Sequence, residues 1–280
     1  YGQSVQGRDL ICWALGEEQA ENRLLLIFGV HGFEDAYDRD GQTLYDLAQA
    51  LREYYAANPE ALNGWRLYLV PSANPDGLTQ GDSNDGFGRC NADVLNINRD
   101  FPVGWKKRAG SRNRTGDEPF ATPEARALRE LVQTIAPTYG VDVHGWTNGV
   151  YGDKPVAECF RRAFDMAYRK YQSGGMLSQW MSTVTQGAAE FLLQADKWEV
   201  RIFGELLQHQ LQRLVAFPVG RAVQNDLHVR ILFFQRRHNG VGALIRVGLA
   251  HHALNQRNVA LAAQDLAAAL GHDAAGNGVV

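Results

Sequence analysis

The apolar residues of the chain follow two different spacings, and each spacing predicts a different kind of element. In residues 23–30, Arg23 is followed by a run that is apolar except for Gly29, and this run has the length of a buried strand. Residues 42–57 instead place apolar side chains three or four positions apart, the period of a helix with one buried face. Both patterns return along the chain, and they predict further strands at 65–70, 139–143 and 187–193 and further helices at 122–135 and 156–171.

This alternation of strands and helices predicts the fold class. Strands joined through helices tend to lie parallel in one sheet, and such sheets are covered on both faces. We therefore predict an α/β fold with a mixed, centrally parallel sheet flanked by helices on both faces. Ligands of such sheets bind beyond the carboxyl ends of the strands.

The segment from residue 71 to residue 91 lacks a regular period. Pro71-Ser-Ala-Asn-Pro-Asp-Gly77 consists mostly of turn-forming residues, and three further glycines follow it before residue 91. We expect a long irregular loop here. Long loops inside a compact domain are usually functional.

Composition and charge narrow the choice of partners. The 280 residues are 45% hydrophobic and 21% charged, which is typical of a globular chain with one large core. A net charge of −3 and a pI near 6.3 give no electrostatic reason to expect nucleic acid. The longest apolar run is far shorter than the ~20 residues of a membrane-spanning helix. We therefore expect a small or peptidic ligand, no nucleic acid and no membrane span.

The composition changes near residue 200. Residues 201–280 contain no Lys, Trp or Tyr and hold six of the eight histidines, with 8 Arg against 4 Asp and Glu. Residues 1–200 carry 20 Lys and Arg against 27 Asp and Glu. We predict a catalytic domain at 1–217, closed by a helix at 198–217. Residues 218–280 form a compositionally distinct segment of unknown role, with a weak helical pattern at 259–270.

Two histidines precede this change, and each of them directly follows a predicted strand. His31-Gly-Phe-Glu34 brings an imidazole and a carboxylate close together in a loop, and His144 can supply a third ligand. Two nitrogens and one carboxylate around Zn²⁺ leave an open position, which is what a catalytic zinc site requires. A His-x-x-Glu pair alone also arises by chance as a polar loop pair.

Five motifs together resemble the zinc carboxypeptidases of the carboxypeptidase A type. Their order and approximate spacing match across about residues 3 to 195, and Ser4 to Arg8 is similar to a motif of bacterial members. The five motifs are His31-x-x-Glu34, Asn74-Pro-Asp-Gly77, Asn98-Arg-Asp-Phe-Pro102, Asp142-x-His144 and Glu190. The resemblance implies one Zn²⁺ per chain, bound by His31, Glu34 and His144.

The resemblance also implies roles for other residues. Glu190 lies in an apolar predicted strand, where a carboxylate is costly unless something uses it, and it would act as general base. Asn98 and Arg99 would hold the terminal carboxylate of the substrate, and Arg89 would stabilise the oxyanion. Tyr171 resembles the tyrosine that closes over bound substrate, with Tyr168 as a competing candidate.

The chain departs from the family pattern in two places. Asn96 stands where most relatives have an aspartate that orients a metal-binding histidine, and its amide oxygen can accept the same imidazole hydrogen without a charge. The specificity segment Gly174–Trp180 contains no acid, so a preference for C-terminal Lys or Arg is not supported. Leu177 and Met176 hint instead at an apolar or mixed pocket.

The function that these expectations favour is a zinc-dependent metallocarboxypeptidase. The alternative is a peptidoglycan peptide hydrolase of the same fold, which cuts a γ-D-glutamyl to diamino-acid bond. An acyl-amino-acid deacylase is less favoured because Asn98, Arg99 and Asn74-Pro-Asp-Gly77 argue for a peptidase. An inactive peptide-binding module is less favoured because no ligand or base is missing. The expected partner is a peptide or cell-wall peptide substrate. Secretion or a cell-envelope location is expected from the family resemblance alone. No signal peptide is visible in the sequence to support it.

Overall fold

The computed structural model describes residues 1–34, 40–145, 148–163, 166–192, 229–230 and 248–249. The chain divides into two compact units, Tyr1–Arg221 and Ala222–Val280. In the second unit, β10 (Val229–Arg230) pairs antiparallel with β11 (Gly248–Leu249). The predicted boundary at 217/218 and the predicted helices at 198–217 and 259–270 lie outside the described residues.

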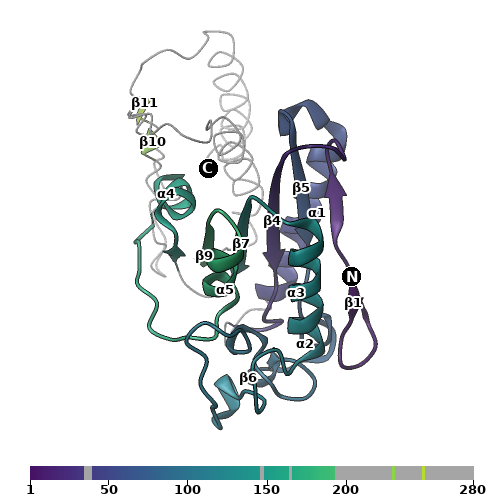
Figure 1. The fold of residues 1–280 in the computed structure, drawn as a ribbon, viewed down its shortest axis with the longest axis vertical. Coiled ribbons are helices and arrows are strands. Elements are labelled where there is room, and N and C mark those ends of the chain that lie inside the picture. Colours follow the sequence, from purple (N-terminus) through teal and green to yellow (C-terminus); the bar gives the residue numbers. More distant parts are fainter. Residues whose placement is uncertain (35–39, 146–147, 164–165, 193–228, 231–247, 250–280) are drawn as a thin grey trace, which may run out of the picture. The chain divides into compact units, whose positions relative to one another are not determined.

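The first unit is built on a six-stranded sheet (Figure 1). Its strand order is β3-β5-β4-β7-β9-β8, in which β5, β4, β7 and β9 run parallel and the two edge strands are antiparallel to their neighbours. The bounds are β3 (Trp13–Leu15), β4 (Asn22–Phe28), β5 (Trp65–Val70), β7 (Tyr139–His144), β8 (Gly149–Gly152) and β9 (Ala188–Leu192). The predicted mixed, centrally parallel sheet is thus confirmed.

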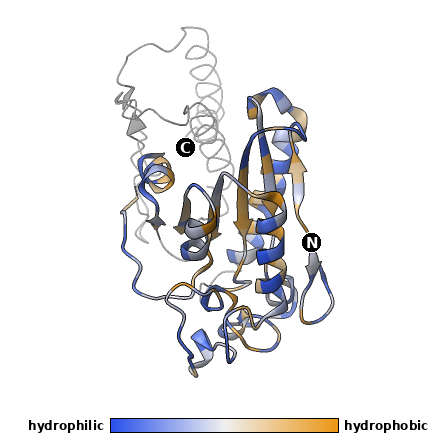
Figure 2. Cartoon of the chain, viewed as in Figure 1, coloured by the Kyte–Doolittle hydropathy of each residue, from blue (hydrophilic) through white to orange (hydrophobic). Residues whose placement is uncertain are grey.

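Alternation along β4 explains the two layers of helices. Leu24, Leu26 and Phe28 point to one face and pack with α1 (Asp40–Ala57) and α4 (Lys154–Ala163). Leu25 and Ile27 point to the other face and pack with α3 (Pro123–Ile135) and α5 (Leu177–Val184). Hydrophobic residues accordingly mark the central strands, while the helices also carry hydrophilic residues (Figure 2).

Smaller elements complete the described part of this unit. A hairpin of β1 (Gly2–Gln3) and β2 (Asp9–Leu10) opens the chain. Three short 3₁₀ helices occur at η1 (Pro59–Leu62), η2 (Ile97–Arg99) and η3 (Ser111–Asn113). No helix among the described residues has both the length and the apolar character needed to cross a bilayer.

The expected irregular loop at 71–91 is more ordered than its glycine content suggests. It contains the short helix α2 (Pro75–Gln80) and the strand β6 (Ser83–Cys90). Asn74 caps α2, because its side chain accepts a hydrogen bond of 3.0 Å from the backbone N–H of Gly77. Both elements lie beyond the sheet, below the central strands in Figure 1.

The predicted helix at 156–171 is wrong in its second half. α4 ends at Ala163, and residues 166–171 are not helical. The backbone N–H of Val150 in β8 donates to the carbonyl of Ala167, and the N–H of Arg169 donates back to Val150. This pairing with the edge of the sheet competes with the helix and replaces it. The sequence pattern did not predict β8 or α5.

Candidate active site

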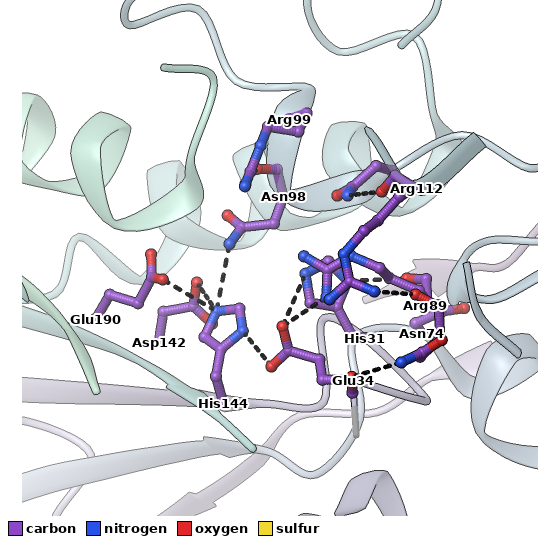
Figure 3. Close-up of polar contacts among 12 residues, drawn as sticks. His31, Glu34, Asn74, Arg89, Asn98, Arg99, Arg112, Asp142, His144 and Glu190 are labelled. Carbon is purple, nitrogen blue, oxygen red and sulfur yellow. Dashed lines mark hydrogen bonds and ion pairs between the residues drawn. The ribbon is translucent and has the colours of Figure 1, made fainter. Parts of the chain in front are cut away.

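The three expected metal ligands meet at the carboxyl ends of two adjacent parallel strands (Figure 3). His31 follows β4 after a two-residue turn, Glu34 lies in the same loop, and His144 is the last residue of β7. Each offers a ligand atom within 4.8 Å of the other two, and all three side chains are buried. Together they form a compact set of two imidazoles and one carboxylate.

The ring of His31 presents a free acceptor to this set. Its Nδ1 lies 2.8 Å from the backbone carbonyl of Arg89, so Nδ1 carries the hydrogen and donates it. Its Nε2 is buried and has no hydrogen-bond partner in the part of the chain that the structure describes, although a carboxylate oxygen of Glu34 lies 3.6 Å away. A buried acceptor without a donor is costly unless a cation uses it.

Asn96 does not orient this histidine, contrary to the expectation from sequence. Its side-chain N–H₂ group donates to the carbonyl of Arg112 over 2.8 Å, and its Oδ1 has no partner. The carbonyl of Arg89 holds the His31 ring instead. A backbone carbonyl therefore supplies the acceptor that the sequence assigned to the side chain of Asn96.

His144 lies between two carboxylates. Its Nδ1 is 3.0 Å from Oε2 of Glu34, and its Nε2 is 2.9 Å from Oδ2 of Asp142. Burial lowers the pKa of His144, but Asp142 and Glu34 outweigh it and hold the pKa well above its usual value. Without a metal the ring is therefore protonated and Nδ1 donates to Glu34; a cation bound here would displace that proton and use Nδ1 as a ligand while Nε2 donates to Asp142.

Glu34 completes a donor set that suits a divalent cation. Oε1 lies 2.7 Å from the Arg89 guanidinium. Burial alone would raise the pKa of Glu34, but His144, His31 and Arg89 lower it by more. The pKa therefore lies well below its usual value, and the carboxylate is ionised. Burial and Arg89 lower the pKa of His31, which keeps that imidazole neutral. Neutral imidazole nitrogens and an ionised carboxylate are the forms that bind Zn²⁺.

Tight backbone packing fixes the loop that carries His31 and Glu34. A Cβ at Gly32 would lie 2.2 Å from the backbone of Gly77 and Leu78 in α2, so only glycine can occupy this position. Gly32 also donates a backbone hydrogen bond of 2.9 Å to Gly88 in β6. The Asn74–Gly77 motif therefore supports the loop and does not reach the ligand set.

Glu190 lies beside this centre on β9. It stands opposite Asp142 in the parallel register, and its Oε1 is 3.9 Å from Nε2 of His144. Its Oε2 accepts a hydrogen bond of 3.0 Å from Ser178 of α5. Burial raises the pKa of Glu190 to about 7, and the charge of Asp142 adds to the shift while His144 opposes it. A carboxylate with such a pKa can accept a proton near neutral pH.

Asn98 and Arg99 lie on one side of the ligand set (Figure 3). Asn98 Oδ1 accepts from the backbone N–H of Leu177 over 2.8 Å, and its Nδ2 lies 3.3 Å from His144. The Arg99 guanidinium donates to the carbonyl of Asn98 over 2.6 Å and has no ion pair among the described residues. Burial and the charge of Arg89 lower the pKa of Arg99 to about 10. An uncompensated cation in this position suits an anion.

The two candidate tyrosines have different surroundings. Tyr171 stacks on Tyr151 and donates from its hydroxyl to Ser178 over 2.9 Å, so it is linked to Glu190. Tyr168 is 39% exposed and donates to the carbonyl of Gly152. Leu177 is fully buried in the core, so it cannot line an apolar specificity pocket as its sequence position suggested.

Two neighbours of the site received no role from the sequence. Asp142 belongs to the motif Asp142-x-His144, and Ser178 lies within the segment Gly174–Trp180, but neither side chain was assigned a role of its own. The alternation of β7 offered a signal for Asp142, because it points to the same side as His144 two residues later. Ser178 lies in α5, which was not predicted, so the sequence carried no usable signal for it.

Comparisons with known proteins agree with this geometry. The model of the zinc carboxypeptidase family matches residues 1–192. The chain is 32% identical over 197 residues to bacteriocin BCN5 of Clostridium perfringens, covering 68% of this chain and 22% of that protein. It is 31% identical over 157 residues to murein peptide amidase A of Escherichia coli K12, covering 51% and 57%.

A solved structure shows the same fold. The murein-tripeptide amidase of Escherichia coli O157 superposes with a TM-score of 0.55 and 22% identity, covering 79% of this chain and 92% of that one. The chain therefore spans 22% of the length of the bacteriocin and 57% of the length of the murein peptide amidase.

Proposed function

The chain belongs to the zinc carboxypeptidase family, and from that membership we propose that it is a zinc-dependent metallocarboxypeptidase that hydrolyses a C-terminal peptide bond. One observation carries the proposal: two buried histidines and one carboxylate offer ligand atoms within 4.8 Å of each other, beside a separate buried carboxylate. The first group suits a metal, and the second suits a base.

One zinc ion per chain is held by His31, Glu34 and His144 in this proposal. Bound zinc supplies a Lewis acid that polarises the scissile carbonyl and makes water more acidic. The Nε2 of His31 supports this assignment, because none of the described residues forms a hydrogen bond with it. Asp142 supports it as well, since a carboxylate on the far nitrogen of His144 orients the ring and raises its basicity.

Glu190 acts as general base and then as general acid. It takes a proton from the attacking water and delivers it to the leaving amine. Arg89 stabilises the negative charge that develops on the carbonyl oxygen. Its guanidinium lies beside Glu34, and its Nε has no hydrogen-bond partner among the described residues, so this N–H is a candidate donor for that oxygen.

Recognition of the substrate falls to Asn98, Arg99 and Tyr171. The Arg99 guanidinium binds the free terminal carboxylate through charge-assisted hydrogen bonds, together with the amide of Asn98. Tyr171 closes over the bound peptide. Among the described residues Arg99 forms no ion pair and its buried Nε has no hydrogen-bond partner, which supports the first assignment because these donors can then bind the substrate carboxylate.

Arg99→Ala tests whether the enzyme is an exopeptidase. We expect kcat/KM for free-acid peptides to fall by about a hundredfold, since a charge-assisted anchor is worth about 1.5–3 kcal/mol. The same peptides with an amidated C-terminus should be affected little. Arg162→Ala removes an exposed arginine of α4 and is the matched control. Equal losses on both peptide series would favour an endopeptidase.

The second candidate is a peptidoglycan peptide hydrolase that cleaves a γ-D-glutamyl to diamino-acid bond. The identity to a murein peptide amidase favours it. The metal ligands and the base would serve both reactions unchanged, so the catalytic core does not separate the two. A substrate of this kind would also require a secreted or cell-envelope protein.

A substrate panel separates the two candidates. The zinc-loaded protein is assayed against peptides of standard amino acids and against cell-wall tripeptides. Release of a C-terminal amino acid from the standard peptides supports the carboxypeptidase. Hydrolysis restricted to the cell-wall peptides supports the second candidate, and no hydrolysis by protein with one zinc per chain would contradict both.

A further inference from the structure

Ser178 links two residues of the candidate site. It is the second residue of α5, and its side chain is fully buried. Its hydroxyl lies 3.0 Å from Oε2 of Glu190 and 2.9 Å from the hydroxyl of Tyr171. Among the described residues, Ser178 provides the one hydrogen bond that the Glu190 carboxylate accepts.

The start of α5 is fixed by the loop that carries Asn98. The backbone N–H of Leu177, the first residue of the helix, donates to Oδ1 of Asn98 over 2.8 Å. The helix then packs against β9 and β7, and Met181 contacts Gly140 so closely that a Cβ there would lie 2.7 Å from its sulfur. The position of Ser178 is therefore set by contacts on both sides of the helix.

The directions of the two hydrogen bonds follow from the donors available. An ionised carboxylate only accepts, so the single hydrogen of the Ser178 hydroxyl points to Glu190. Tyr171 must then donate its own hydrogen to the Ser178 oxygen. The chain runs from Tyr171 to Ser178 to Glu190, and each hydroxyl uses its one hydrogen once.

We propose that Ser178 is a positioning residue that aims the Glu190 carboxylate at the candidate metal centre, with Tyr171 orienting the serine hydroxyl in the substrate-free site. The proposal rests on the proposed role of Glu190 as base. The hydrogen bond holds Oε2, and it leaves Oε1 on the side of His144, 3.9 Å from Nε2. A glutamate side chain has three rotatable bonds, and misplacing a reacting group by about 1 Å can cost about a hundredfold in rate.

Ser178→Ala and Ser178→Thr test this role. The alanine removes the hydroxyl, and the threonine restores it. Ser182→Ala is the matched control, because Ser182 lies one turn later in α5 and its hydroxyl donates only to the carbonyl of Ser178. For each variant, kcat and KM are measured on a free-acid peptide, together with zinc content and the free energy of unfolding.

We expect Ser178→Ala to lower kcat by about 10- to 100-fold with KM and zinc content unchanged, and Ser178→Thr to recover most of the loss. Ser182→Ala should stay within twofold of the wild type. A kcat within twofold of the wild type in Ser178→Ala would overturn the inference, as would equal losses in Ser178→Ala and Ser182→Ala. If threonine does not fold, Ser178→Cys with its weak donor takes its place and should recover only part of the rate.

Glu190→Gln separates this inference from the proposed function. Full activity in Glu190→Gln would refute the general base and the inference with it. An inactive Glu190→Gln beside a fully active Ser178→Ala would overturn the positioning role alone.

Discussion

At the scale of single residues, the catalytic account depends on Glu190. The strand that carries it is otherwise apolar, and all five of its residues are buried. Glu190→Gln keeps the shape and the hydrogen bond from Ser178 but cannot accept a proton. We expect kcat to fall by about 10²–10⁴-fold or more, while KM and zinc content stay close to the wild type. Steady-state kinetics with metal analysis would check this, and a near-normal kcat would require another base.

Candidate site residues could be named from the sequence where a family motif coincided with the end of a predicted strand. His31, Glu34 and His144 could be named as candidates because two predicted strands, 23–30 and 139–143, are each followed by a histidine and Glu34 lies three residues after the first of these histidines. The partner of His31 could not be named, because a backbone carbonyl leaves no mark in the sequence. Ser178 could not be named either, since its contact with Glu190 depends on how α5 packs on β9.

At the scale of elements, α3 offers a direct test of how the motif Asn98–Pro102 is built into the fold. Thr122 caps the helix by accepting from the N–H of Ala125, and its hydroxyl donates to Asp100 over 2.8 Å. Asp100 follows Arg99 in the chain, so the cap also anchors the motif.

We expect Thr122→Ala to lower the free energy of unfolding by about 1–2 kcal/mol, because it removes the cap and one donor to a buried carboxylate. Thr134→Ala is the control, since its exposed hydroxyl donates only to Glu130 in the same helix; it should change stability by less than about 0.5 kcal/mol. Denaturant titration gives both values. Equal losses would mean that the cap contributes nothing of its own.

Strands and helices with a clear hydrophobic pattern in their own sequence were predictable. Elements that depend on hydrogen bonding to a neighbouring strand were not. Strands β4, β5, β7 and β9 and the helices α1 and α3 match their predicted ranges to within about two residues, because their buried faces show in the sequence. The strand β8 is four residues long and exists through its ladder with β9. Its pairing with Ala167 and Arg169 also explains why the predicted helix at 156–171 stops early.

At the scale of the whole molecule, the sheet was predictable because strand and helix patterns alternate. The strand order was not predictable, because it depends on crossovers that these patterns do not specify.

All the family motifs precede residue 192, where the match to the family model ends. Residues 218–280 should therefore contribute little to activity. A chain ending at residue 217 should hydrolyse the same peptides at a measurable rate. A folded but inactive truncated chain would contradict this.

The central claim is that one zinc ion binds to His31, Glu34 and His144, and an anomalous difference map from crystals of the zinc-loaded protein tests it most directly. The account predicts one peak per chain at ~2.0–2.2 Å from Nε2 of His31, Nδ1 of His144 and a carboxylate oxygen of Glu34. No peak at this point, or a peak held instead by Asp142, His144 and Glu190, would contradict it.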